Sequence, residues 1–171
     1  SLCIRVNDRR VVAYVAGALF GDGAAAVVLR NSAGAHNHGP RIGTIATVGE
    51  HLWRDTGHIM GWDITSDGFG IVLSAELPSL IETRFAPAVA EFLARKNLSR
   101  DDFVGYLLHP GSAKLIDAAT KALDLAPDAL DPSRAVLREY GNMSSATILF
   151  VLQHAIRSGR KGRHVVAAFG P

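Results

Sequence analysis

The sequence has almost no cysteine: Cys3 is the single one among 171 residues. One thiol cannot form an internal disulfide, so the disulfide-rich secreted domains are excluded. A single thiol suits the reducing cytoplasm, and we predict a cytoplasmic location. Cys3 lies in the run "SLCIRV", which has a strand pattern, so a packed core thiol is favoured over a reactive one.

The sequence also lacks an excess of charge of either sign and any long apolar run. The formal net charge is +2, which is too small to predict nucleic-acid binding. No apolar run approaches the roughly 18 residues of a membrane span, and the first residues show no basic-then-apolar signal pattern. With 48% hydrophobic residues the chain can bury a core, so we predict one soluble domain over residues 1–171.

Polar residues are scarce at both ends. The sequence begins on "SLCIRV" and stops after "VVAAFGP", whereas natural domains more often begin and end in polar segments. We therefore expect a piece of a longer protein, or a chain trimmed to its ordered part.

What the sequence does contain is a succession of strand and helix patterns. Strand patterns come first: apolar runs around a Gly-Asp-Gly turn, an alternating segment, and a hairpin around Ser-Asp-Gly, at residues 11–30, 41–50 and 61–75. A helix, a strand and a second helix follow, at residues 77–97, 103–111 and 112–125. Next come a proline-containing loop, an apolar helix that begins near Asn142 within residues 138–159, and a last strand at 164–170. This order predicts an α/β fold, with layers around a mixed β-sheet and a buried central helix.

Two residues occupy places where α/β proteins perform chemistry. His109 ends the stretch "FVGYLLHPG", and ligands of open α/β sheets bind at strand ends. Asn142 stands just before the apolar helix, in "YGNMSSATILFVL". On position alone, His109 could simply cap a strand and Asn142 could simply cap a helix. Together, an imidazole and a carboxamide could hold a thioester carbonyl and stabilise the oxyanion that forms there.

The remaining patterns point to no further chemistry. A nucleophile is missing, because Cys3 is the single candidate. His36 and His38 have a metal-compatible spacing but no third ligand, so no metal is predicted. The "GDG" triplet at 21–23 lacks the rest of a nucleotide-binding motif. The basic segment "RSGRKGR" at 157–163 is most simply a solvated connection, with anion binding as the alternative.

Five segments, taken in order, resemble one family. They are "GALFGDGAAAVVL" (17–29), "MGWDITSDGFGIVLSAELP" (60–78), "LLHPGSAKLID" (107–117), "REYGNMSSATILFVL" (138–152) and "AAFGP" (167–171). They resemble the C-terminal half of type III polyketide synthases, the chalcone and stilbene synthase family. The resemblance implies a thiolase-like fold of two similar halves. It also implies that the nucleophilic cysteine lies in an N-terminal half that these 171 residues do not include.

By this resemblance, His109 and Asn142 match the histidine and asparagine of a Cys-His-Asn triad. The pair would bind the malonyl thioester carbonyl, promote decarboxylation and stabilise the enolate. Phe20 matches an aromatic gatekeeper between the coenzyme A tunnel and the cavity. Ile71 falls near a second gatekeeper that is aromatic in plant enzymes, and an aliphatic side chain there would widen the cavity. Lys114, one turn into the following helix, could approach a coenzyme A phosphate or could be a solvated helix residue.

The implied activity is that of an acyltransferase that condenses an acyl-CoA starter with malonyl-CoA. The resemblance implies no cofactor beyond these thioesters, and a homodimer with much of its surface in the N-terminal half. Because the nucleophilic cysteine also lies in that half, this chain alone is expected to be inactive. The "MGWD" block is more similar to bacterial members that make alkylpyrones or alkylresorcinols. Two alternatives stay open: an enzyme similar to ketoacyl-carrier-protein synthase III, which usually places Gln-Ala-Asn after its histidine, and a half-domain that binds acyl ligands without turnover.

Overall fold

The structure, a computed structural model, describes residue 5 and residues 7–31, 41–66 and 68–170. Its main elements are α1 (Val11–Leu19), β1 (Met60–Thr65), β2 (Gly68–Leu73), α2 (Leu77–Arg95), β3 (Gly105–Leu108), α3 (Ala113–Ala122), α4 (Asp131–Tyr140), α5 (Thr147–Arg157) and β4 (His164–Ala167). Short 3₁₀ helices at Arg100–Asp102 and Ser144–Ala146 precede β3 and α5. The described strands form an antiparallel pair, β1–β2, and a parallel pair, β3–β4.

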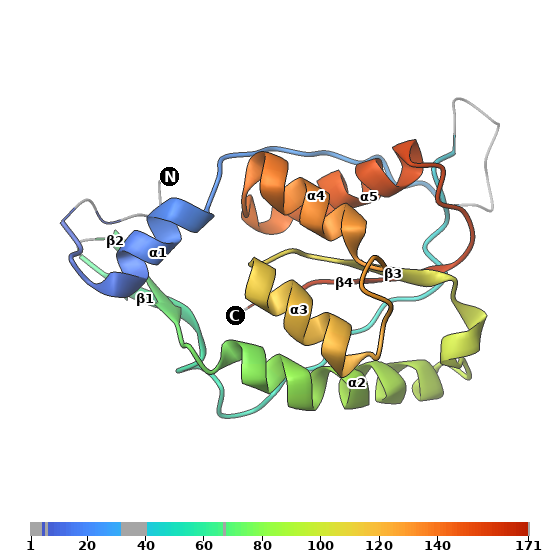
Figure 1. Cartoon of the computed structure of the whole chain (residues 1–171), viewed down its shortest axis with the longest axis horizontal. Helices are drawn as coiled ribbons and strands as arrows, with labels where there is room; N and C mark the ends of the chain where they lie inside the picture. Colours follow the sequence, from blue (N-terminus) through green and yellow to red (C-terminus); the bar gives the residue numbers. More distant parts are fainter. Residues whose placement is uncertain (1–4, 6, 32–40, 67, 171) are drawn as a thin grey trace.

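The parallel pair is the middle layer of the main body. In Figure 1, α4 and α5 lie on one side of β3 and β4, and α2 and α3 lie on the other. Alternation along β3 explains the layers, because successive side chains point to opposite faces. Leu108 packs with the α2–α3 core, whereas Leu107 packs with Val136 of α4 and Val151 of α5. The predicted α/β class is confirmed, with both senses of strand pairing present.

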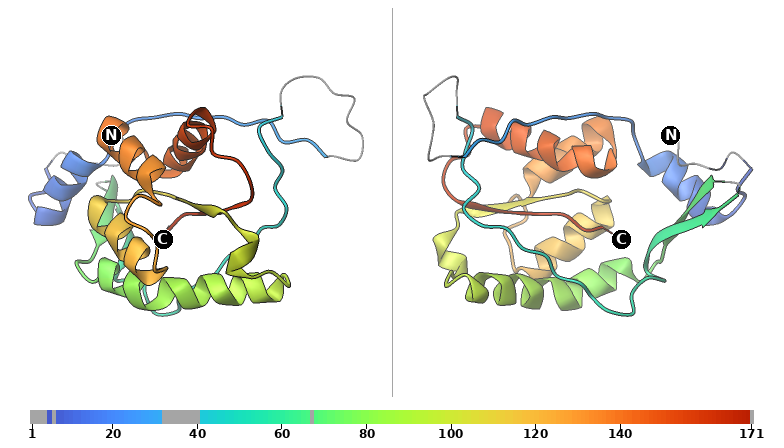
Figure 2. Two further views of the ribbon diagram at one scale, coloured as in Figure 1. Left: turned by 45° about the vertical axis from the view of Figure 1, so that its right-hand side comes forward. Right: turned by 180° about the vertical axis from the view of Figure 1, so that it is seen from behind.

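The hairpin and α1 form a second group beside the main body (Figures 1 and 2). The predicted hairpin is confirmed, and its register runs from Met60 opposite Leu73 to Thr65 opposite Gly68. Gly68 has a φ of 106°, a backbone conformation that favours glycine and explains the "SDG" turn. Arg5 ties the segment before α1 to this hairpin, because its Nη2 donates to the carbonyl of Gly68 (2.8 Å).

The strand predictions for residues 11–30 and 41–50 are wrong. Valine-rich runs favour strands, yet Val11–Leu19 forms α1, which contacts β2 and buries only Ala16. Residues 22–31 then run as irregular chain past α5 (Figure 2). Residues 41–53 likewise have neither helical nor strand pairing in the described structure. A strand needs a neighbouring strand for its backbone hydrogen bonds, and alternation alone cannot supply one.

One helix was not predicted at all. Residues 131–140 were expected as part of a proline-containing loop, and they form α4. Asp131 and Pro132 stand in its first turn, where an acidic residue and a proline both favour a helix start. No helix of the described residues is long and apolar enough to cross a bilayer.

Candidate active site

His109 lies on a tight turn between β3 and α3. Its N–H donates to the Ala167 carbonyl of β4 (2.8 Å), and its carbonyl accepts from the Gly111 N–H (3.0 Å). Gly111 lies close to the following helix, because a Cβ there would lie 2.8 Å from Leu115 Cδ1, and the Leu115 side chain would have to move to admit one. The Ser112 hydroxyl caps α3 by accepting the Leu115 N–H. The predicted strand end and helix start around this histidine are both present.

Asn142 lies in the loop between α4 and α5 and is 5% exposed. Its Oδ1 accepts the Ser144 N–H (2.9 Å) at the start of the 3₁₀ helix that leads into α5. Its Nδ2 donates to the Gly111 carbonyl (3.1 Å) on the His109 turn. The oxygen therefore accepts a local backbone bond two residues along the chain, while the NH₂ group faces the histidine turn. A primary amide has two N–H donors, so the bond to Gly111 leaves one for a ligand.

These contacts bring His109 and Asn142 to one turn, which no sequence pattern could establish. Burial lowers the pKa of His109 below its ordinary value of 6.5. The imidazole is therefore neutral at pH 7 and offers one N–H donor and one acceptor. A neutral imidazole and a buried carboxamide can together donate hydrogen bonds to a carbonyl oxygen that gains negative charge.

Phe20 is joined to Asn142 through the backbone. The Asn142 N–H donates to the Leu19 carbonyl (2.9 Å), and the Gly21 N–H donates to the Asn142 carbonyl (3.0 Å). The two bonds form an isolated parallel bridge between Phe20 and Asn142. The predicted gatekeeper and the predicted catalytic amide therefore share one piece of backbone pairing.

The glycines of the "GDG" triplet allow this close approach. A Cβ at Gly21 would lie 2.3 Å from the Tyr140 carbonyl oxygen, and a Cβ at Gly23 would lie 2.3 Å from Met143 Sδ. The expected tight turn or bulge between two strands is wrong, since the triplet follows a helix. Its glycines are explained by contact with the Asn142 loop.

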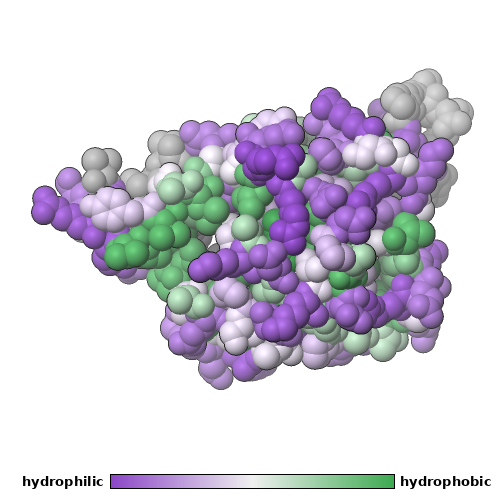
Figure 3. All heavy atoms as spheres, in the orientation of Figure 1, coloured by the Kyte–Doolittle hydropathy of each residue, from purple (hydrophilic) through white to green (hydrophobic). Residues whose placement is uncertain are grey.

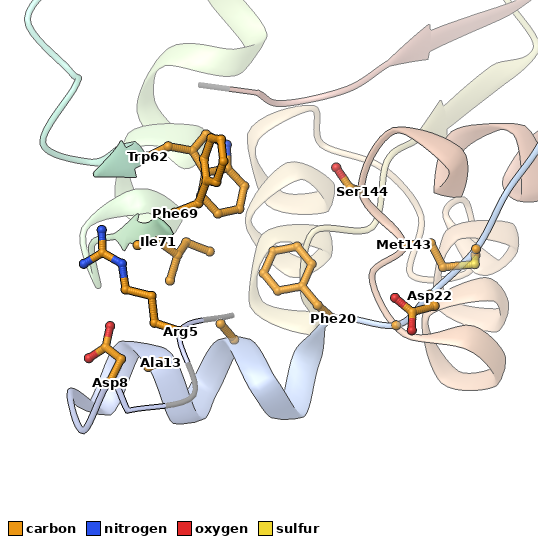
Figure 4. A pocket seen from close by; sticks show the side chains of 14 residues that line it. Arg5, Asp8, Ala13, Phe20, Asp22, Trp62, Phe69, Ile71, Met143 and Ser144 are labelled. Carbon is orange, nitrogen blue, oxygen red and sulfur yellow. The ribbon is translucent and has the colours of Figure 1, made fainter. Parts of the chain in front are cut away.

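A cavity of about 210 Å³ opens beside the bridge. Phe20 and Ile71 both line it, together with Trp62, Phe69 and Ser144. Figure 4 shows the Phe20 ring between the hairpin side chains and Ser144. Trp62 and Phe69 pack edge to face, with ring centroids 6.2 Å apart. The two residues predicted as gatekeepers thus meet at one apolar opening.

Trp62 and Phe69 are cavity residues that the sequence analysis missed. The hairpin pattern could have found them. Trp62 is the cross-strand partner of Ile71, and Phe69 lies two residues before Ile71 on β2. Once the hairpin and its turn are recognised, period-two alternation places all three side chains on one face. Met143 also lines the cavity, from an irregular loop whose sequence gives no such signal.

Of the predicted site residues, Phe20 and Ile71 line the cavity, whereas His109 and Asn142 do not. Lys114 is exposed on the first turn of α3 and does not line the cavity. Its contact with coenzyme A stays a prediction. Cys3, His36 and His38 lie outside the described residues.

Comparison with known proteins identifies the family. A family model described as chalcone and stilbene synthases, C-terminal domain, matches residues 45–170. The chain is 41% identical over 147 residues to a 1,3,6,8-tetrahydroxynaphthalene synthase of Streptomyces peucetius subsp. caesius, which covers 86% of this chain and 39% of that protein. It is 34% identical over 179 residues to a putative chalcone synthase of Bacillus subtilis (strain 168), which covers 100% of this chain and 48% of that protein.

The fold is shared with a solved structure. The crystal structure of 1,3,6,8-tetrahydroxynaphthalene synthase from Streptomyces coelicolor A3(2), described as a bacterial type III polyketide synthase, matches with a TM-score of 0.78 at 31% identity. The match covers 92% of this chain and 43% of that one. The chain thus spans less than half the length of these relatives. It belongs to the chalcone and stilbene synthase family and carries that family's C-terminal domain.

Proposed function

We propose that the complete protein is a type III polyketide synthase, an acyltransferase that condenses an acyl-CoA starter with malonyl-CoA. The observation that carries the proposal is the hydrogen bond from Asn142 Nδ2 to the Gly111 carbonyl, because it holds the carboxamide on the turn that bears His109. Membership of the chalcone and stilbene synthase family supports the reaction type. This chain supplies two members of the triad, and the N-terminal half supplies the nucleophilic cysteine.

In the proposed reaction, His109 and Asn142 each donate an N–H to the malonyl thioester oxygen. The bond between the carboxylate carbon and the methylene carbon breaks and CO₂ leaves. The electron pair stays on the methylene carbon as an enolate, whose oxygen the two donors stabilise. The enolate carbon then attacks the acyl thioester on the cysteine, a carbon–carbon bond forms, and the cysteine thiolate leaves. A histidine kept neutral by burial suits this role, because it can donate without carrying a charge.

The surface of the chain supports a covering N-terminal half. Large apolar side chains are exposed along the unpaired segments and on α1 and the hairpin: Val11, Tyr14, Val28, Leu29, Ile42, Ile45, Val48, Leu52 and Ile64. Figure 3 shows apolar surface gathered over the α1 and hairpin end of the molecule. Exposed apolar surface of this kind marks a site of association. We assign it to the N-terminal half of the same protein, within a homodimer.

The proposed substrates need no resident cofactor or metal. The cavity lined by Phe20 and Ile71 receives the acyl chain, and the aliphatic Ile71 leaves room for a long one, as in alkylpyrone and alkylresorcinol synthesis. Lys114 is the candidate contact for a coenzyme A phosphate. The single cysteine of these 171 residues suits the cytoplasm, where we propose that the protein acts.

The test is the decarboxylation of malonyl-CoA by the full-length protein. His109→Gln and Asn142→Ala should each lower the rate roughly 100-fold or more, the usual cost of losing an oxyanion donor. His58→Gln, at an exposed position, is the matched control and should leave the rate unchanged. A near-normal rate in either site variant would contradict the assignment. Turnover of malonyl-carrier protein instead of malonyl-CoA would support the ketoacyl synthase alternative, and turnover of neither would support an acyl-binding half-domain.

A further inference from the structure

We infer that Ser133 is a positioning residue for His109, acting through a hydrogen bond from its buried hydroxyl to the end of β3. Ser133 Oγ donates to the Leu108 carbonyl over 2.6 Å, and Ser133 is 1% exposed. Leu108 is the last residue of β3 and directly precedes His109. The inference rests on the catalytic role proposed for His109.

The register of the sheet explains why the Leu108 carbonyl takes a side-chain donor. Leu108 is the Cα partner of Ala167, and the His109 N–H donates to the Ala167 carbonyl. In a parallel ladder Ala167 bonds to the residues on either side of Leu108, so the peptide groups of Leu108 point to the opposite edge of β3. No described strand pairs with that edge. A hydroxyl from α4 satisfies the carbonyl instead.

The sequence delivers this hydroxyl from the buried side of α4. Ser133 follows Pro132 in the first turn, and the side chain of Val136 continues the buried face into the core around Leu107. A hydroxyl on an apolar helix face costs free energy unless it finds a partner, and here the partner lies 25 residues away on β3. The bond therefore joins the helix to the strand rather than capping α4.

Two side chains consequently hold the backbone on either side of His109. Ser133 donates to the carbonyl of the residue that precedes His109. Asn142 donates to the carbonyl of Gly111, two residues after His109. The His109 N–H is fixed to β4 as well. A side chain on a backbone held at these points keeps its place relative to Asn142. Removing the Ser133 donor leaves a buried carbonyl unsatisfied, and we expect the end of β3 to shift toward another donor.

The experiment compares Ser133→Ala and Ser133→Thr in the full-length protein, at a temperature well below the Tm of each. Ser133→Ala should lower kcat for malonyl-CoA decarboxylation roughly 10- to 100-fold, the scale of a displacement near 1 Å at a reacting group, with KM little changed. Ser133→Thr keeps the hydroxyl and should restore most of the rate. Thr120→Ala is the matched control, because Thr120 Oγ1 bonds the Ile116 carbonyl within α3 (2.7 Å).

A second readout does not depend on turnover. The His109 ring signal is followed by NMR in protein with labelled histidine and is assigned by its loss in His109→Gln. It should move in Ser133→Ala, return in Ser133→Thr and stay in place in Thr120→Ala. Wild-type protein without malonyl-CoA turnover would refute the proposed function, while the ring signal would still decide the positioning role. A Ser133→Ala protein with wild-type kcat or an unmoved ring signal would overturn the inference.

Discussion

Gly21→Ala tests whether Phe20 and Asn142 depend on their close backbone contact. A Cβ at position 21 would lie 2.3 Å from the Tyr140 carbonyl oxygen, which belongs to the backbone and cannot rotate away. Carbon–oxygen contacts in proteins lie near 3.3–3.6 Å, so one segment must move by about 1 Å. Such overpacking costs roughly 1–3 kcal/mol of unfolding free energy. The same shift moves Asn142 relative to His109, and a displacement of that size costs roughly 100-fold in rate.

Gly17→Ala is the matched control for this variant. Position 17 lies four residues earlier, inside α1, and a Cβ there meets nothing within 4 Å. Alanine is favoured over glycine in a helix interior by about 0.5–1 kcal/mol. The same chemical change should therefore stabilise the protein at position 17 and destabilise it at position 21.

The assay pairs denaturant unfolding with malonyl-CoA decarboxylation, both on the full-length protein. We expect Gly21→Ala to lose stability and activity together, and Gly17→Ala to keep its activity. If Gly21→Ala unfolds at the wild-type denaturant concentration and decarboxylates at the wild-type rate, the bridge between Phe20 and Asn142 does not hold the site.

Two further predictions concern the same site. Phe20→Ala should change which acyl-CoA starters the full-length protein accepts, while decarboxylation stays detectable. Product analysis with starters of increasing length measures this change. An unchanged product profile would remove the gatekeeper role. Because burial lowers the pKa of His109, the unfolded chain binds a proton there more readily than the folded one. That histidine should therefore cost no stability above pH 7 and an increasing amount as the pH falls below about 6.5. Denaturant unfolding at pH 7.5 and 5.5 checks this, since His109→Gln should lose less stability on acidification than the wild type, and equal losses would refute it.

The periodicity of apolar residues was sufficient to predict helices and strands that pack against a neighbouring element in the sequence. The two strands of the hairpin pair with each other, and α2 packs on α3, so their patterns predict them well. The strand pattern of β3 was also sufficient, although its partner β4 lies far along the chain. The pattern failed for Val11–Leu19. The β-branched residues of this segment favour a strand, but a strand also needs a pairing partner, and the segment instead forms a helix that contacts β2. The pattern failed for α4 because Pro132 and the polar residues around it resemble a loop until the buried face of Ser133 and Val136 is seen.

The candidate site also has parts that local sequence patterns predict and parts that they do not. His109 at a strand end and Asn142 before a helix could be predicted from local patterns and from family motifs. The bond between Asn142 and Gly111 could not, because it joins two loops that local propensity does not relate. Ser133 carries no motif at all, and its importance lies in the register of β3 and β4, which only the folded chain defines.

The bridge between Phe20 and Asn142 also has a consequence for the order of folding. It joins Phe20 to Asn142, which lie far apart in the sequence, so it closes a very long loop. Contacts of such sequence separation form slowly, whereas the hairpin and the α2–α3 pair need only local contacts. In refolding, helical signal should therefore return before enzymatic activity. A nascent chain released before residue 142 would lack Asn142, α5 and β4, and would therefore have no working site.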